Sequence, residues 1–146
     1  MKQSKLIVTI LLSTITIIFS SCTITKDDGD WDPMKLTKQE ITFNANGGVD
    51  SIIVNNYSVM WMSRVYEGES NNPTKEYRII NTAYQDAQVL NGDWFQASAD
   101  IMPNKQNWAY IYVNKNTSGK DRQLTITLTC GDIFNNISVK QSADIK

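Results

Sequence analysis

Strict alternation of apolar and polar residues in the last third of the chain is the feature that most constrains its fold. Along Gln123–Cys130, an apolar residue or the final cysteine occupies every second position, and threonine or glutamine occupies the positions between them. Side chains of a β-strand point alternately to opposite faces, so this period predicts a strand with one packed and one solvated face. The run Ile133–Lys140 follows a Gly131-Asp132 turn and shows a similar period. We therefore expect an antiparallel, half-buried strand pair here.

The rest of the chain after residue 35 consists of short β-type runs separated by turn residues, without a long apolar stripe of helical period. This pattern predicts an all-β fold, an immunoglobulin-like antiparallel β-sandwich of about seven strands. The Asn44–Gly48 turn predicts that its two flanking strands form a hairpin. Trp61 is expected in the central core position of the third strand. The further predicted strands are Leu36–Phe43, Val49–Asn55, Val59–Tyr66, Glu76–Asn81, Trp94–Ala99 and Trp108–Val113.

An apolar run near the N-terminus follows a positively charged start. Lys2 and Lys5 precede Leu6–Phe19, which contains only apolar residues, threonine and serine. A membrane-spanning helix needs about 20 apolar residues and this run is shorter, so we expect a cleaved export signal at residues 1–21. The next residue, Cys22, completes a motif that resembles a bacterial lipobox, which implies that this cysteine carries a lipid. The alternative is an uncleaved signal anchor.

An acidic segment, residues 22–34, separates the signal from the β-type runs. A segment this polar cannot bury enough apolar surface to fold alone, so we predict a flexible tether ahead of a single domain at residues 35–146. Its acids are interpreted in one of two ways. They are a solvated linker, or Lys26-Asp27-Asp28 acts as a signal, since it resembles the acidic surface-export signal of Bacteroidetes lipoproteins.

The residue types that are missing exclude several kinds of chemistry. The chain has no histidine, two cysteines and a formal net charge of −1. Ser/His/Asp catalysis and His-based zinc sites are therefore excluded, and nothing favours nucleic acid. A lipidated Cys22 leaves Cys130 without a disulfide partner, so Cys130 is expected to be a small buried residue. We predict no metal and no cofactor.

A succession of short phrases along the chain resembles the signatures of BACON domains, the Bacteroidetes-associated carbohydrate-binding, often N-terminal family. The order of the phrases, with an Asn-Thr turn before an arginine and a terminal Val-x-Gln, carries the resemblance. The matching phrases are Ile41-Thr42-Phe43, Gly47-Gly48, Ile52–Asn55, Gly92–Phe95, Val113–Thr117, Arg122, Leu124–Ile126 and Val139–Ser142.

This resemblance implies a seven-stranded sandwich, a Bacteroidetes origin and a place on or near the cell surface beside glycan-degrading systems. It also implies binding of carbohydrate or mucin, or a role as a spacer. The sequence departs from the family in Met62–Asp93, where the usual connection is much shorter. We expect this insertion to add a strand pair and a long loop. Because loops carry binding residues, Tyr66, Tyr77 and Tyr84 are secondary candidates.

The most specific binding candidates lie in Trp108–Val113. Alternation sends the aliphatic residues of this run to one face and Trp108, Tyr110 and Tyr112 to the other. With the aliphatic set facing the core, the three rings form an outward row spaced about 6.6–7 Å, on which sugar rings could stack. The alternatives are that the rings only cover the sheet beside cross-strand threonines and lysines, or that Trp108 folds into the core.

Together these observations predict a non-catalytic lipoprotein, anchored by lipid at the outer membrane and exposed on the cell surface, that binds carbohydrate or mucin. The alternative function is a structural spacer or protein-interaction module of a surface glycan-utilisation complex. A glycosidase needs two positioned carboxylates. The nearest pair, Glu67 and Glu69, lies in the polar stretch Glu67–Lys75, which is predicted to be a loop. The expected partners are the membrane, a glycan or mucin, and other surface proteins.

Overall fold

The computed structural model describes residues 31–79, 87–100 and 107–144. The predicted signal at residues 1–21, Cys22, Tyr84 and most of the predicted tether lie outside the described residues. The chain divides into two units, Met1–Trp31 and Asp32–Lys146, and the second contains all the strands described below. Across 31–79, 87–100 and 107–144, no helix has the length and apolar character needed to cross a membrane.

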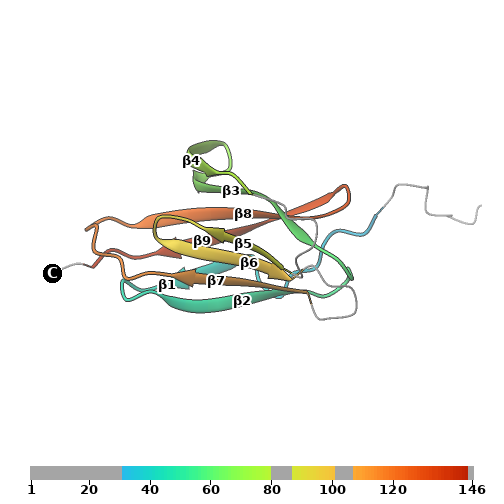
Figure 1. Cartoon of the computed structure of the whole chain (residues 1–146), viewed down its shortest axis with the longest axis horizontal. Helices are drawn as coiled ribbons and strands as arrows, with labels where there is room; N and C mark the ends of the chain where they lie inside the picture. The colour runs from blue at the N-terminus through green and yellow to red at the C-terminus, as the bar shows by residue number, and fades with distance from the viewer. Residues whose placement is uncertain (1–30, 80–86, 101–106, 145–146) are drawn as a thin grey trace, which may run out of the picture. The chain divides into compact units, whose positions relative to one another are not determined.

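The described residues form two β-sheets that face each other as the layers of a sandwich (Figure 1). One sheet has the strand order β1-β9-β8-β3-β4, and the other has the order β2-β7-β6-β5. This all-β sandwich is the fold that the sequence predicts. The nine strands of the described part are β1 (Glu40–Phe43), β2 (Gly48–Val54), β3 (Trp61–Glu69), β4 (Asn72–Tyr77), β5 (Ala87–Asn91), β6 (Phe95–Asp100), β7 (Asn107–Val113), β8 (Arg122–Cys130) and β9 (Ile133–Gln141).

The first two strands do not form the predicted hairpin. Strand β1 pairs in parallel with β9, and β2 pairs with β7 in the opposite sheet. Both strands bury alternate apolar residues, with Ile41 on β1 and Ile52 on β2 almost fully buried. Strands in opposite sheets can direct these residues into one shared interior from both sides. The Asn44–Gly48 turn is therefore a crossover between sheets, and the parallel β1/β9 pair corrects the prediction of a purely antiparallel sandwich.

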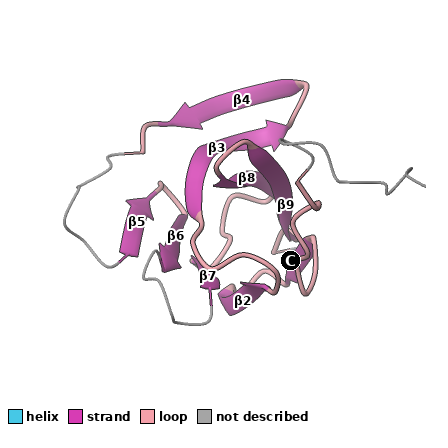
Figure 2. Ribbon diagram, turned by 90° about the vertical axis from the view of Figure 1, so that its right-hand side faces the viewer, coloured by secondary structure: helices cyan, strands magenta, loops and turns pink. Residues whose placement is uncertain are grey.

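The insertion Met62–Asp93 extends both sheets beyond the predicted seven strands. The stretch Glu67–Lys75, predicted to be a loop, instead belongs to the hairpin that β3 and β4 form at one edge (Figure 2). Gly68 has a φ of 88°, and the pairing register shifts beside it. The glycine allows this irregular backbone within the hairpin, in a stretch whose polar composition predicts a loop. Strand β5 pairs with β6 at the edge of the other sheet. The insertion thus adds one edge strand to each sheet, β4 beside β3 and β5 beside β6.

The core face predicted for β8 is confirmed, because Leu124, Ile126 and Leu128 are each at most 1% exposed. The opposite face is not the solvated one that the sequence predicts, since Thr125 and Thr129 are 6% and 2% exposed and their hydroxyls donate to backbone carbonyls. Cys130, which shares the core face, is only partly buried at the end of the strand, so the expectation of a fully buried cysteine is wrong. Burial still raises the pKa of the Cys130 thiol. A raised pKa lowers the thiolate fraction at neutral pH, which makes Cys130 a poor nucleophile.

Trp61 is not the central core residue that the sequence predicts. It pairs with Thr129 on the outer face of its sheet and is only partly buried, whereas the next residue, Met62, faces the core and is 1% exposed. The side chain of Gln88 from the other sheet holds this orientation, since its Oε1 accepts a hydrogen bond from the Met62 N–H at 2.6 Å. The core tryptophan is Trp94, which is 7% exposed.

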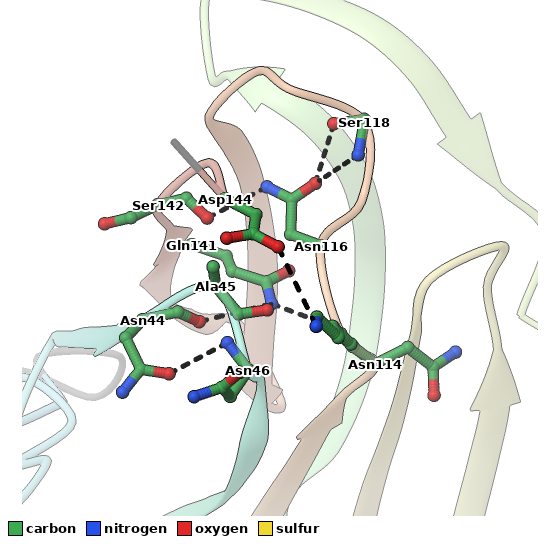
Figure 3. Close-up of polar contacts among 10 residues, drawn as sticks. Asn44, Ala45, Asn46, Asn114, Asn116, Ser118, Gln141, Ser142 and Asp144 are labelled. Atoms are coloured by element: carbon green, nitrogen blue, oxygen red, sulfur yellow. Dashed lines mark hydrogen bonds and ion pairs between the residues drawn. The ribbon is translucent and has the colours of Figure 1, made fainter. Parts of the chain in front are cut away.

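A polar network closes the sandwich where β7 ends (Figure 3). The buried amide of Gln141, from β9, donates to the backbone carbonyl of Asn114 at 2.8 Å. Asn116 is 0% exposed, and its amide nitrogen donates to the Lys120 carbonyl at 2.8 Å and the Ser142 carbonyl at 3.0 Å. These buried amides bond loop carbonyls of Asn114, Lys120 and Ser142, so the network ties the loops of both sheets together.

Candidate functional site

The candidate site is the outer face of the four-stranded sheet, centred on β7. This strand lies between β2 and β6, and its residues Ala109, Ile111 and Val113 are each at most 2% exposed toward the core. Strand alternation then sends the three aromatic side chains to the opposite face. Tyr110 is 39% exposed and Tyr112 is 45% exposed. The predicted outward direction of the aromatic row, Trp108, Tyr110 and Tyr112, is thereby confirmed.

The rings of Trp108 and Tyr110 are stacked with nearly parallel planes, so each covers part of one face of the other. Their centroids are 5.5 Å apart and their planes differ by 11°. This separation is smaller than the predicted repeat of about 6.6–7 Å, because the rings lean together beyond their Cα positions. Trp108 is only partly buried and packs beside the exposed Tyr110, so it does not fold into the core.

Small residues flank the middle of the aromatic row. Ser51 of β2 and Ser98 of β6 both pair directly with Tyr110, one on each side. Tyr112 pairs with Val49 and Gln96 in the same two strands. No threonine or lysine stands directly opposite Tyr110 or Tyr112, so the alternative that these rings cover the sheet by pairing with such side chains is wrong. The serines leave the sides of Tyr110 open and add hydroxyl groups that can donate or accept hydrogen bonds.

A pocket of about 420 Å³ adjoins the row at Tyr112. Its polar lining consists of the amide residues Asn91 and Gln96, which pair across the β5/β6 hairpin, and Asn114, which follows β7. The Gln96 Nε2 donates to the Asn91 Oδ1 at 2.7 Å, which orients both amides. Sequence reasoning missed this cluster, because only the β5-β6-β7 order brings the three amides together.

Two of the secondary tyrosine candidates, Tyr66 and Tyr77, do not contribute to this site. Tyr66 is 1% exposed, and the Arg64 guanidinium lies 4.7 Å from its ring centroid. Tyr77 packs edge-on against Phe95, with centroids 5.0 Å apart, and its hydroxyl donates to the Glu67 carboxylate. Burial, with a smaller effect from Glu67, raises the pKa of Tyr77. Both rings are therefore committed to packing contacts, and Tyr84 lies outside the described residues.

Several acidic residues of the described part form structural pairs with neighbouring side chains. Glu67 accepts the hydrogen bond from Tyr77, and Glu69 lies exposed at the end of β3. Within residues 31–79, 87–100 and 107–144, no group of three or more histidine, cysteine, aspartate or glutamate side chains is placed to hold a metal ion. The exposed carboxylate Glu76 accepts a bidentate pair of hydrogen bonds from Arg64, which lowers the pKa of Glu76.

Comparison with known proteins gives one informative similarity. No protein-family model matches the chain, and no curated protein matches it significantly. Among solved structures, the chain is similar to the NMR structure of a protein from Bacteroides thetaiotaomicron, with 26% sequence identity and a TM-score of 0.60. The match covers 86% of this chain and 100% of that chain. The similarity supports the β-sandwich fold described above.

Proposed function

We propose that this protein is a non-catalytic outer-membrane lipoprotein whose sandwich binds carbohydrate, including mucin glycans. The observation that carries the proposal is the aromatic row on the outer face of the four-stranded sheet, with serines on both sides of Tyr110. Monomeric proteins seldom expose a contiguous apolar surface without a binding role. The resemblance to BACON domains points to the same ligand class.

The chemistry of the row suits sugars. Aromatic faces carry negative charge density and attract the C–H-rich faces of pyranose rings. Ser51 and Ser98 flank Tyr110 in the two neighbouring strands, so their hydroxyls can hydrogen-bond a sugar that stacks on this ring. Stacking removes apolar surface from water while the polar edges of the sugar retain hydrogen-bond partners. Because β7 is a central strand, the platform is rigid before the ligand arrives.

Lipid attachment at Cys22 is the second part of the proposal. The charged start, the apolar run and the lipobox-like motif support it, and the similarity to a Bacteroides protein agrees with a Bacteroidetes origin. The tether ends earlier than the predicted boundary at residue 34, because Met34 is 4% exposed in the core and the second unit begins at Asp32. Residues 22–31 are long enough, at about 3.3 Å per extended residue, to hold the domain about 30 Å from the lipid. The binding face then lies outside the membrane, within reach of glycans.

Cys22→Ala is expected to release the protein from the membrane. Without the thiol no lipid can be attached, and an acyl anchor supplies about 0.8 kcal/mol for each buried methylene. Fractionation of cells into membrane and soluble parts measures the change. Cys130→Ala is the matched control and should remain with the membrane. A Cys22→Ala variant that stays tightly membrane-bound contradicts lipidation and favours the uncleaved anchor.

Trp108→Ala and Tyr110→Ala are each expected to weaken retention on immobilised mucin by about tenfold or more. Truncation of one aromatic anchor at the centre of an interface typically costs about 2 kcal/mol. The unfolding midpoint should change little, since both rings lie on the outer face rather than in the core. Affinity chromatography and thermal unfolding of the same samples measure the two effects.

Two exposed apolar residues on other strands provide the controls for this experiment. Val89→Ala alters the same sheet face away from the row, and Phe134→Ala alters the other sheet. Both variants should bind mucin like the unmodified protein. Unchanged retention for Tyr110→Ala contradicts the proposal. Unfolding of that variant would instead assign the ring a structural role.

Docking of a surface protein is the second candidate function, and a specific observation favours it. Val49 and Val89 are 67% and 54% exposed on the same face as the aromatic row. Sugar binding does not use these aliphatic side chains, whereas a protein partner buries them together with the rings. If Val49→Ser and Val89→Ser lower retention on mucin as strongly as Tyr110→Ala does, the face binds the polypeptide of the mucin rather than its glycans.

A further inference from the structure

We infer that the aromatic row ends in a subsite for one terminal, uncharged sugar unit, formed by Tyr112 and the three amides Asn91, Gln96 and Asn114. This inference rests on the proposed glycan binding. It adds a pocket of defined chemistry at one end of the aromatic row. The pocket volume of about 420 Å³ falls within the range of small-ligand sites, about 300–1,000 Å³.

The position of the pocket makes it the end of the row. Strand β7 ends at Val113, and the next residue, Asn114, donates its backbone N–H to the Trp94 carbonyl at 2.8 Å. The Asn114 side chain projects away from Gln141 and the network around it (Figure 3). A glycan lying along the rings toward Tyr112 therefore meets the Asn114 amide where the sheet stops. The sugar beyond Tyr112 is the last unit that the face can hold.

The amides are suited to the hydroxyl groups of a sugar. Each amide offers one acceptor oxygen and two N–H donors, so a single side chain can bond two neighbouring hydroxyls. Gln96 and Asn91 are already joined by a 2.7 Å hydrogen bond, which leaves their remaining donors and acceptors in fixed directions. Among the described residues, no hydrogen-bond partner is found for the Asn114 side chain, although its backbone is bonded on both sides.

The floor of the pocket is rigid. A Cβ placed on Gly92 would lie 2.1 Å from the Phe95 ring, so the glycine is what allows this ring to pack beneath the turn. Phe95 is 2% exposed and packs edge-on against both Tyr77 and Trp94. The Gly92 N–H also donates to the Phe95 carbonyl at 2.8 Å. A floor held by packing and a hydrogen-bonded turn keeps the amides at fixed positions.

The lining of the pocket also selects against acidic sugars. Its described lining residues carry no charge, so a carboxylate or sulfate entering it would lose water without gaining a cation. Hydroxyl groups lose less hydration free energy than charged groups on leaving water, and the amides replace the hydrogen bonds that the hydroxyls made with water. The subsite therefore discriminates in favour of neutral hexoses and N-acetylhexosamines over uronic acids.

The test is an NMR titration of the ¹⁵N-labelled protein with free monosaccharides. The probes are glucose, galactose, mannose and N-acetylglucosamine, with glucuronic acid as the charged counterpart. At least one neutral sugar should shift the side-chain amide signals of Gln96 and Asn114 saturably, with a Kd of about 1 mM, since a single unit buries little surface. Gln96→Ala and Asn114→Ala should each weaken this binding by about three- to tenfold. Asn55→Ala, which removes an exposed amide elsewhere, should leave it unchanged.

The outcomes separate this inference from the proposed function. If Trp108→Ala abolishes mucin retention but keeps the monosaccharide shifts, the glycan-binding proposal and the terminal subsite are both supported. If mucin retention depends on Trp108 while none of the neutral sugars shifts the amide signals, glycan binding stands and the terminal subsite is overturned. Equal binding of glucuronic acid overturns the selection for uncharged sugars. If the unmodified protein neither retains mucin nor responds to any monosaccharide, both proposals fail.

Discussion

Gly47→Ala is expected to destabilise the domain by about 3 kcal/mol. The residue has a φ of 76°, where a side chain costs about 1–2 kcal/mol. Its new Cβ would also lie 2.3 Å from the carbonyl oxygen of Val113, a backbone atom that cannot rotate away. Relief requires the crossover between β1 and β2 to move away from β7, and such overpacking typically costs a further 1–3 kcal/mol, roughly. Chemical denaturation measures the loss.

Gly119→Ala is the matched control for this substitution. Gly119 has a similar φ of 71°, but a Cβ added there meets nothing within 4 Å. Replacing Gly119 by alanine should therefore lower the unfolding free energy only through the cost of a side chain at positive φ, about 1 kcal/mol. The difference between the two variants isolates the close approach of the crossover to β7. Equal destabilisation by both substitutions would show that this approach contributes nothing to stability.

Asn116→Ala is expected to cost about 3 kcal/mol, because one buried side chain serves four hydrogen bonds. Its nitrogen donates to the carbonyls of Lys120 and Ser142, and its oxygen accepts from the Ser118 backbone N–H at 3.1 Å and hydroxyl at 2.7 Å. Alanine leaves these groups without their partner at a position that is 0% exposed. Each buried polar group that loses its partner costs about 1–3 kcal/mol, although water recovers part of this once the loop loosens.

The variant Asn116→Asp separates the two halves of this network. It keeps an acceptor for Ser118 but places a carboxylate oxygen against two carbonyls in place of the donor. The variant should be destabilised at neutral pH and partly recover at acidic pH, where a neutral carboxyl regains one donor. Thr117→Ala, at the exposed neighbouring position, should change the unfolding free energy by less than about 0.5 kcal/mol. A small effect of Asn116→Ala would mean that the network does not hold the loops.

These two substitutions also test how the candidate site is supported. Both Gly47 and Asn116 act on the loop that follows β7, which carries Asn114 at the end of the aromatic row. Loosening of this loop leaves Trp108 and Tyr110 in the middle of the sheet. We therefore expect a folded variant at either position to lose more of the monosaccharide response than of the mucin retention.

Local sequence determined which way the side chains of the main strands face. In β7 the aliphatic residues face the core and the aromatic row faces outward, as the alternation predicts. In β8 the same period identifies Leu124, Ile126 and Leu128 as core residues. The period of two is a property of the extended backbone itself, so it holds whichever strands pair with it.

Only the tertiary structure decided which strands become neighbours and which residues share a surface. The turn after β1 gives no sign that β2 enters the other sheet, because a crossover and a hairpin use the same turn residues. Trp61 faces outward while Met62 takes the core position, and Gln88, distant in sequence, accepts the hydrogen bond of the Met62 N–H. Asn91, Gln96 and Asn114 meet because β5, β6 and β7 are adjacent in the sheet. Such placements depend on long-range pairing, which alternation within a single strand does not encode.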